Sequence, residues 1–309
     1  MPNLYVKFID TIAKHQKRLY KTDWKTSISY GETARAILDG LIEKFGEARI
    51  RKEVVDGLDV LGKNLEKLLR APRGKPSREV CERYESMAEV LMLHPKRKTD
   101  AVKVLKTFGK YVNKLAKKNI HDAYSYALEV DRMAAFWEPK KVNANLNGIV
   151  GVVGKYANKL DGESRYRYIA DFNEILQEFK ETEWNPEETL ALIGGYARGI
   201  CAMDEKIGQK FLDRASFLVK TSRSAGVDPA RAVEMVGYHT KMAILDRNAC
   251  IDYIHHAPCQ LFDVKTGNKG GLEKLDKYSR EKLGDAIRET LLFTLQLEMS
   301  SRRDSSYLV

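Results

Sequence analysis

The sequence predicts an all-α protein: an α-solenoid of antiparallel helix pairs, with about 40–47 residues per repeat and roughly 13 helices. Three observations carry this prediction. Apolar residues recur at intervals of three and four, which is the helical period. Prolines fall between the periodic segments, where a helix tolerates the missing N–H group. One segment of the chain is also repeated along the sequence.

The segment 100–118 shows the helical period most clearly. Its apolar stripe consists of Val102, Leu105, Phe108, Val112 and Leu115. Such a stripe is typical of a helix that packs by one face. Seven prolines separate segments of this kind and predict helix boundaries: Pro72, Pro76, Pro95, Pro139, Pro186, Pro229 and Pro258.

The repeat is strongest between residues 109–115 and 154–160. The sequences GKYVNKL and GKYANKL match at six of seven positions with an offset of 45. Weaker copies keep the same frame at Gly62, Gly194, Gly237 and Gly284, and an apolar residue precedes each glycine. We call these four residues, together with Gly109 and Gly154, the six repeat glycines.

Nine residues before the four central repeat glycines stands an Asp or Asn: Asp100, Asn145, Asn185 and Asp228. These residue types are strong helix N-caps, because their side chains accept the free N–H groups of the first turn. Proline follows two of them, at the favoured first helical position. Each repeat is therefore expected to begin with a capped first helix and to continue into a second.

Glycine inside a helix costs about 1 kcal/mol relative to alanine, so its recurrence at one frame position needs a reason. We expect close packing of successive first helices at this glycine. Tyr111, Tyr156 and Tyr196 stand two residues after three of the repeat glycines, and His239 takes the same place in a fourth. They are either spacers in the core or groups on which bases stack.

The chain is expected to divide into N-terminal helical repeats (1–95), central helix-pair repeats (96–260), and a C-terminal loop, capping helix and polar tail (261–309). No apolar run is long enough for a membrane span. The basic, partly apolar first 25 residues are either an organelle-targeting segment or an ordinary first helix.

Positive charge is concentrated in the first half. Residues 1–160 hold 32 Lys and Arg against 19 Asp and Glu, whereas residues 161–309 hold 21 against 24. Such asymmetry favours a polyanionic partner, although a solvated surface has the same composition. We expect phosphate contacts from ten residues: Lys96, Arg97, Lys98, Lys103, Lys106, Lys110, Lys114, Lys117, Lys155 and Lys159.

Motifs for catalysis or cofactors are lacking. The glycine-rich segment 267–271 does not follow the order of a phosphate-binding loop. His255, His256 and Cys259 lack a second cluster that would complete a tetrahedral metal site. The sequence thus predicts no enzyme, no cofactor, no metal and no small-molecule substrate.

The segment 185–198, NPEETLALIGGYAR, resembles the repeats of octotricopeptide proteins and of FAST-kinase/RAP-type proteins, and segment 228–241 is the next most similar. The resemblance covers residues 100–260 and implies work on RNA in mitochondria or plastids. Two departures argue against catalytic RNA processing and base-by-base reading. The repeats here are longer than those of the family, and residues 272–309 are typical of one helix and a tail, without a RAP domain.

These features together predict a non-catalytic binding protein of an organellar ribonucleoprotein, such as a mitochondrial ribosome or an RNA-processing complex. RNA backbone and protein subunits are the expected partners. The expected compartment is the mitochondrion, otherwise the cytoplasm. The alternative is a protein-interaction scaffold of HEAT or armadillo type with no nucleic-acid role.

Overall fold

The computed structural model describes residues 4–45, 51–70, 75–93, 100–136, 144–261 and 271–305, and within them every regular element is an α-helix. The all-α class is confirmed, with thirteen helices in these residues. The continuous solenoid stays a prediction. The chain forms two compact units, residues 1–158 and 159–309. The divisions expected at residues 95 and 260 also stay predictions.

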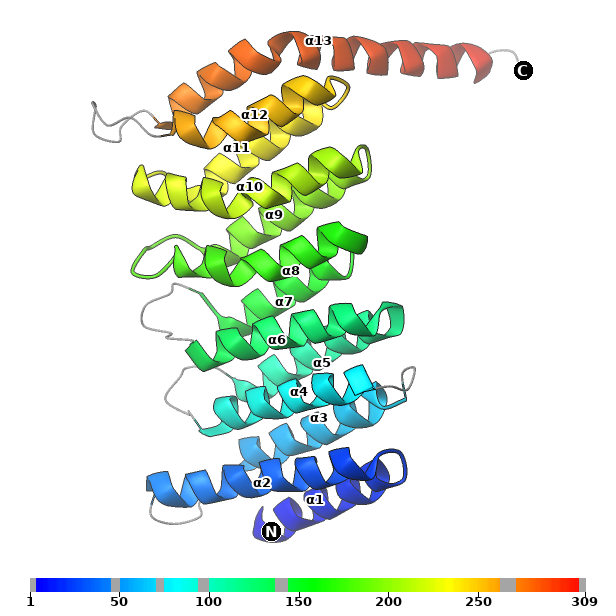
Figure 1. Ribbon diagram of the computed structural model, residues 1–309, viewed down its shortest axis with the longest axis vertical. Helices are drawn as coiled ribbons and strands as arrows, with labels where there is room; N and C mark the ends of the chain where they lie inside the picture. The colour runs from blue at the N-terminus through cyan, green and yellow to red at the C-terminus, as the bar shows by residue number, and fades with distance from the viewer. Residues whose placement is uncertain are drawn as a thin grey trace. The chain divides into compact units, whose positions relative to one another are not determined.

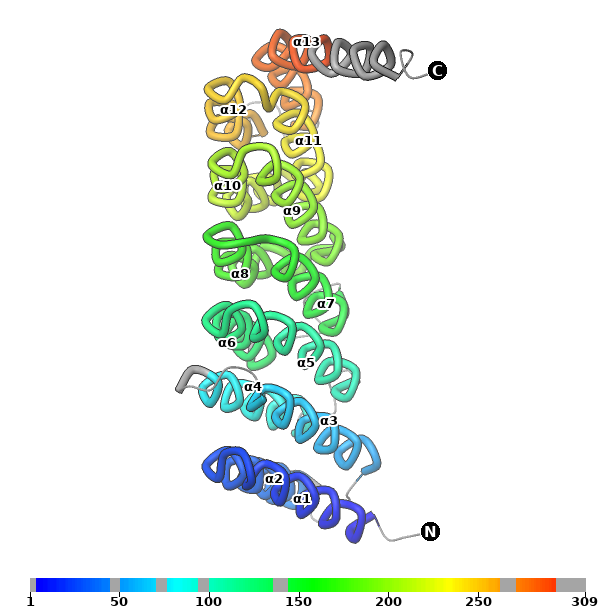
Figure 2. Tube along the Cα trace, turned by 90° about the vertical axis from the view of Figure 1, so that its right-hand side faces the viewer, coloured from blue at the N-terminus to red at the C-terminus, as the bar shows by residue number. Residues whose placement is uncertain are grey.

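Seven helices make up the first unit: α1 (Leu4–Tyr20), α2 (Trp24–Phe45), α3 (Lys52–Leu68), α4 (Lys75–Leu93), α5 (Ala101–Lys118), α6 (Ile120–Phe136) and α7 (Leu146–Ala157). Within this unit, each helix packs against the next helix but one, and each except α2 also packs against its successor. The odd-numbered helices consequently form one layer and the even-numbered helices another (Figures 1 and 2).

The second unit follows the same plan with six helices: α8 (Gly162–Gln177), α9 (Pro186–Cys201), α10 (Glu205–Ser224), α11 (Pro229–Met242), α12 (Arg247–Gln260) and α13 (Gly271–Ser305). Here α9 packs against α11 and α11 against α13, while α8, α10 and α12 form the other layer (Figure 2).

All four predicted N-caps are confirmed. Asp100, Asn145, Asn185 and Asp228 each have extended backbone, and each side chain accepts a hydrogen bond from a first-turn N–H group. The distances are 2.9–3.0 Å. The first helix of each central repeat therefore begins where the sequence predicts.

The repeat glycines lie where successive odd-numbered helices meet most closely. A Cβ atom on Gly62 would come within 3.0 Å of the His15 ring, and one on Gly109 would meet Asn64 at similarly close range. Gly154 is equally close to Tyr111, and Gly237 to Tyr196. The expected close packing is confirmed at these four positions.

Gly284 does not follow this pattern. It lies in α13, and a Cβ atom there would have no neighbour within 4 Å. The expectation that it marks another packed crossing is wrong, because α13 places no further helix of the described residues against this glycine. Pro258 is a second correction. It lies inside α12, two residues before the last helical residue, Gln260, rather than between helices.

Buried tyrosines join the two layers, and the sequence analysis missed them. Four hydroxyl groups on even-numbered helices donate to a backbone carbonyl four residues before a repeat glycine, at 2.6–3.1 Å: Tyr30 to Leu58, Tyr84 to Leu105, Tyr126 to Val150 and Tyr168 to Leu190. The 42-residue spacing from Tyr84 to Tyr126 and to Tyr168 is visible in the sequence. Phe211 holds the next place in this series and has no hydroxyl group to donate.

Candidate nucleic-acid interface

The predicted lysine stripe lies on one exposed face of α5. Successive residues of a helix are rotated by about 100°, so the spacing of Lys103, Lys106, Lys110, Lys114 and Lys117 confines them to about 80° of the helix circumference. All five are exposed. The opposite face, with Leu105, Phe108 and Val112, is fully buried. Burial of this apolar face fixes the helix and directs the lysines outward.

Little negative charge offsets this stripe. Lys103 forms an ion pair with Asp100, with Nζ 3.2 Å from Oδ2. Among the described residues, no carboxylate lies within ion-pair distance of the other four lysines of the stripe, Lys106, Lys110, Lys114 and Lys117. Like charges at such spacings repel by a few tenths of a kcal/mol per pair. An external polyanion would relieve that repulsion.

Tyr111 lies beneath two of these lysines. The Nζ atoms of Lys110 and Lys114 lie 5.0 and 6.0 Å from the centre of its ring. The same arrangement recurs in α7, where Lys155 Nζ lies 5.0 Å from the centre of the Tyr156 ring. A cation over an aromatic face is attracted by the ring quadrupole, which favours one orientation of the lysine. The repeated pair therefore presents Lys110 and Lys155 in the same way.

The tyrosines themselves are half-buried. Tyr111 packs against Gly154 and Tyr196 against Gly237, so both act as spacers between successive first helices. This contact occupies part of each ring. A stacking role for Tyr111, Tyr156 and Tyr196 stays a prediction.

Four of the ten predicted phosphate contacts fall elsewhere. Lys96, Arg97 and Lys98 lie outside the described residues. Lys159 is exposed but belongs to the second unit. The structure thus brings together the α5 lysines with Lys155 of the adjacent α7.

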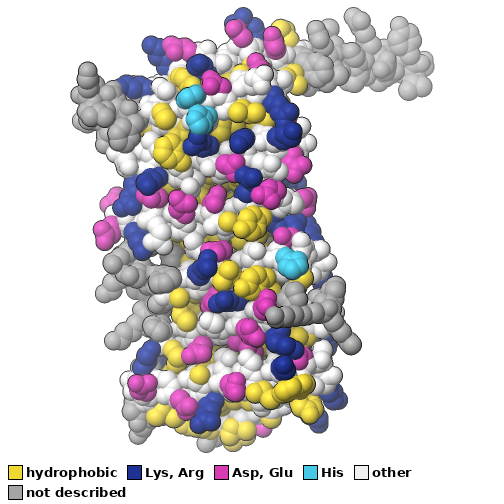
Figure 3. Space-filling model, viewed as in Figure 1, with side chains coloured by type: hydrophobic (Ala, Val, Ile, Leu, Met, Phe, Trp, Pro, Cys, Tyr) yellow, Lys and Arg dark blue, Asp and Glu magenta, His cyan; other side chains and the backbone are white. Residues whose placement is uncertain are grey.

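The even-numbered layer has a different surface. Figure 3 views that layer in each unit, and Lys and Arg are interspersed there with Asp and Glu. Several of these charges are paired, for example Arg132 with Glu129 at 2.7 Å and Arg223 with Glu178 at 3.3 Å. A mixed and paired surface attracts a polyanion weakly, so the odd-numbered layer of the first unit is the better candidate.

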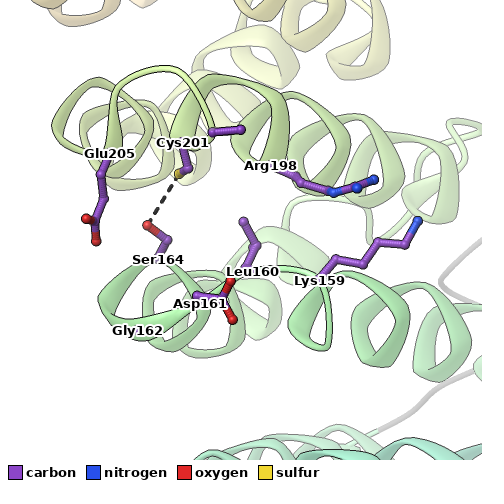
Figure 4. Close-up of a pocket in the computed structure, with 9 residues that line it drawn as sticks. Lys159, Leu160, Asp161, Gly162, Ser164, Arg198, Cys201 and Glu205 are labelled. Carbon is purple, nitrogen blue, oxygen red and sulfur yellow. Dashed lines mark hydrogen bonds between the residues drawn. The ribbon is translucent and has the colours of Figure 1, made fainter.

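A pocket of about 460 Å³ in the second unit is lined by Lys159, Ser164, Arg198, Cys201 and Glu205 among others. Cys201 Sγ lies 3.3 Å from Ser164 Oγ, while Lys159 and Arg198 extend toward another side of the pocket (Figure 4). Burial raises the pKa of the Cys201 thiol. A protonated thiol is a poor nucleophile, and none of the described residues that line this pocket is a histidine that could act as its base.

The two adjacent histidines, His255 and His256, contact side chains of the same chain. His255 contacts Arg214, and His256 lies 3.3 Å from Asp252. No cluster of three or more His, Cys, Asp or Glu suited to a metal ion occurs in the described part of the chain. Over the same residues, no helix has the length and apolar character needed to cross a bilayer.

Comparison with models of protein families and with curated proteins gives no match for this chain. The fold itself defines the class: an all-α protein of helical-repeat type, with first helices joined at glycines and second helices joined to them by buried tyrosines.

Proposed function

We propose that the first unit binds the RNA backbone through the exposed face of α5 and α7, as a non-catalytic component of an organellar ribonucleoprotein. A mitochondrial ribosome or RNA-processing complex is the proposed setting. The observation that carries the proposal is the α5 stripe, in which four exposed lysines share one face without a neighbouring carboxylate among the described residues. Phosphates neutralise such a stripe, and release of their counterions drives binding.

The test is the affinity of the full chain for a single-stranded uridine 12-mer, measured by fluorescence anisotropy at several salt concentrations. A plot of log affinity against log salt concentration has a slope of about −0.7 for each lysine–phosphate contact. Each contact therefore raises the affinity at 0.1 M salt about fivefold over its value at 1 M salt. The triple variant Lys110→Gln, Lys114→Gln, Lys117→Gln should therefore lose about 100-fold in affinity at 0.1 M salt and about 2 in slope.

The matched control replaces three exposed lysines of the second unit, Lys206, Lys220 and Lys241, by glutamine. It removes the same charge and should change affinity by less than about threefold, since long-range effects are screened beyond about 10 Å at 0.1 M salt. Equal losses in the two triple variants would show general charge attraction rather than an interface on α5. No measurable binding by the unmodified chain would reject the proposal in favour of a protein-interaction scaffold.

Membership of a ribonucleoprotein needs a second measurement. The tagged protein, purified from its native cells with and without ribonuclease, is sedimented through a density gradient. Co-migration with a large particle that ribonuclease dissolves supports the proposal. A small complex that ribonuclease leaves intact contradicts it.

A further inference from the structure

The glycine contacts establish a common register for the first helices of the first unit. His15 of α1 contacts Gly62 of α3, Asn64 contacts Gly109 of α5, and Tyr111 contacts Gly154 of α7. Asn64 and Tyr111 each stand two residues after their own repeat glycine. His15 stands two residues after Ala13, so Ala13 occupies in α1 the position that a repeat glycine occupies in α3, α5 and α7. Residues at equal offsets therefore occupy equivalent places on successive helices.

This register aligns cations that lie far apart in the sequence. We define the cation rows as the residues one, five and eight positions after the repeat-glycine position. In the first unit these are Lys14, Arg18 and Lys21 in and after α1; Lys63, Lys67 and Arg70 in and after α3; Lys110, Lys114 and Lys117 of α5; and Lys155 of α7. Every one of these positions is Lys or Arg, and every one is exposed.

Negative charge reaches the rows only between α1 and α3 in the described residues. Asp59 pairs with Lys14 at 2.9 Å and also with Lys63, and Glu66 lies 3.7 Å from Arg18. These two carboxylates also flank the buried His15, at 3.0 and 2.6 Å, so they serve the core as well. The remaining seven cations have no carboxylate within ion-pair distance in the described chain: Lys21, Lys67, Arg70, Lys110, Lys114, Lys117 and Lys155.

The other half of the same face is not uniformly basic. Six and three positions before the glycine position stand Asp56 and Asp59 on α3, and Gly148 and Gly151 on α7. On α1 these positions hold Lys7 and Asp10, so only α5 has lysines at both, Lys103 and Lys106. Continuous positive charge thus runs across the helices near their C-terminal ends, not along one helix. The helix dipole also favours cations at helix C-terminal ends. It does not explain why seven of these ten cations have no carboxylate within ion-pair distance among the described residues.

We propose that a single RNA strand crosses α1, α3, α5 and α7 along the cation rows, near the C-terminal ends of these helices, with its phosphates against successive rows. The proposal rests on the proposed function and adds the path and extent of the bound strand. Adjacent packed helices lie about 8–10 Å apart, so four of them span about 24–30 Å. That span corresponds to about eight nucleotides of a stacked strand, at about 3.4 Å per nucleotide.

Three variants of the full chain separate this path from its alternatives, with the uridine 12-mer as the probe. The first replaces Lys110, Lys114 and Lys117 by glutamine. The second replaces Lys21, Lys67 and Arg70, which lie on or after α1 and α3. The third replaces Lys103 and Lys106. Circular dichroism checks that each variant keeps the helical content of the unmodified chain.

A strand along the cation rows predicts that the first and second variants each lose about 100-fold in affinity at 0.1 M salt, and that the third loses less than about fivefold. Affinity should also rise with oligouridine length up to about eight nucleotides and then level off. A strand that follows α5 instead predicts large losses in the first and third variants and none in the second. That result would overturn the path and leave the proposed function standing. If no variant loses affinity, the path and the proposed function both fail.

Discussion

The two units share one packing plan and differ in what it presents to solvent. In both, a repeat glycine receives a side chain from the preceding first helix, as Gly154 receives Tyr111 and Gly237 receives Tyr196. In both, a tyrosine hydroxyl reaches a carbonyl of the next first helix. The scaffold is therefore the same while the exposed positions are free to vary.

The row positions differ sharply between the two units. On the first helices of the second unit they hold Gly195, Gly199 and Ala202 in and after α9; Tyr238, Met242 and Leu245 in and after α11; and Asp285, Glu289 and Leu292 in α13. None of these nine is basic, and Lys159, five residues after Gly154, is a basic row residue that falls in the second unit. Repeat register fixes where a side chain lies, and residue type decides what it binds. In the proposed function, RNA affinity therefore belongs to the row residues and not to the repeat fold.

Lysines introduced at the row positions of the second unit test whether the row residues determine RNA affinity. Of all the predicted effects, this one should be the largest. The quadruple variant Gly199→Lys, Ala202→Lys, Tyr238→Lys, Leu245→Lys places lysines at cation-row positions of α9 and α11. A Cβ atom on Gly199 has its nearest neighbour at 3.9 Å, so this substitution fits. At about fivefold per phosphate contact, we expect affinity for a uridine 24-mer to rise by about 100-fold or more at 0.1 M salt.

The control for this transplant adds four lysines at exposed positions of the even-numbered layer of the second unit: Gln177, Ser224, Asn248 and Cys259. Anisotropy titrations of the two variants differ only in where the charge lies. Equal gains in affinity would mean that the register is irrelevant and net charge alone attracts RNA.

Much of this scaffold was predictable from the sequence, because its devices are local. The N-caps at Asp100 and Asn185 act within three residues, and the glycine–tyrosine motif repeats almost verbatim at Gly109 and Gly154.

The proposed interface was predicted from the sequence only in part. The α5 lysines stood out as a run along one helix, whereas Lys21, Lys67 and Arg70 are scattered in the sequence and align only once the glycine contacts set the register.

Contacts between layers were not predictable in the same way. The hydroxyl of Tyr84 reaches a carbonyl 21 residues away, and Glu85 is buried beside Ser29 of α2, 56 residues earlier. No local pattern marks a charged residue as buried. Glutamate side chains are rarely buried, and here only tertiary packing removes Glu85 from water.

Buried carboxyl groups give the second test of the comparison. Burial raises the pKa of Glu85 in the first unit to about 8, with Glu82 and Glu32 adding repulsion, and it raises that of Asp171 in the second to about 6. The folded state then binds the Glu85 proton more tightly than the unfolded state. Stability should fall as pH rises from about 4.5 to about 8 and be level on either side.

Replacing Glu85 by Gln removes this titration. Between pH 5 and pH 9, the difference in unfolding free energy between Glu85→Gln and the unmodified chain should shift by about 2–4 kcal/mol in favour of the variant. Urea denaturation across this pH range measures it. Asp171→Asn is the counterpart in the second unit. The difference in unfolding free energy between this variant and the unmodified chain should change with pH only below about pH 6. A flat difference curve for Glu85→Gln would show that this carboxyl group is solvated in the folded chain.

The smallest effect comes from the shared packing, and it should be alike in the two units. Gly154→Ala and Gly237→Ala force a methyl group against Tyr111 and Tyr196, closest to the Cγ atom of each, where the side chain has little freedom to move. We expect each to lower the unfolding free energy by about 1–3 kcal/mol, the usual cost of overpacking. Gly284→Ala, which meets nothing within 4 Å, should instead stabilise α13 by about 0.5–1 kcal/mol through helix propensity. Thermal unfolding of the three variants measures the contrast. If Gly154→Ala is as stabilising as Gly284→Ala, the glycine contacts do not set the register, and the alignment of the cation rows loses its physical basis.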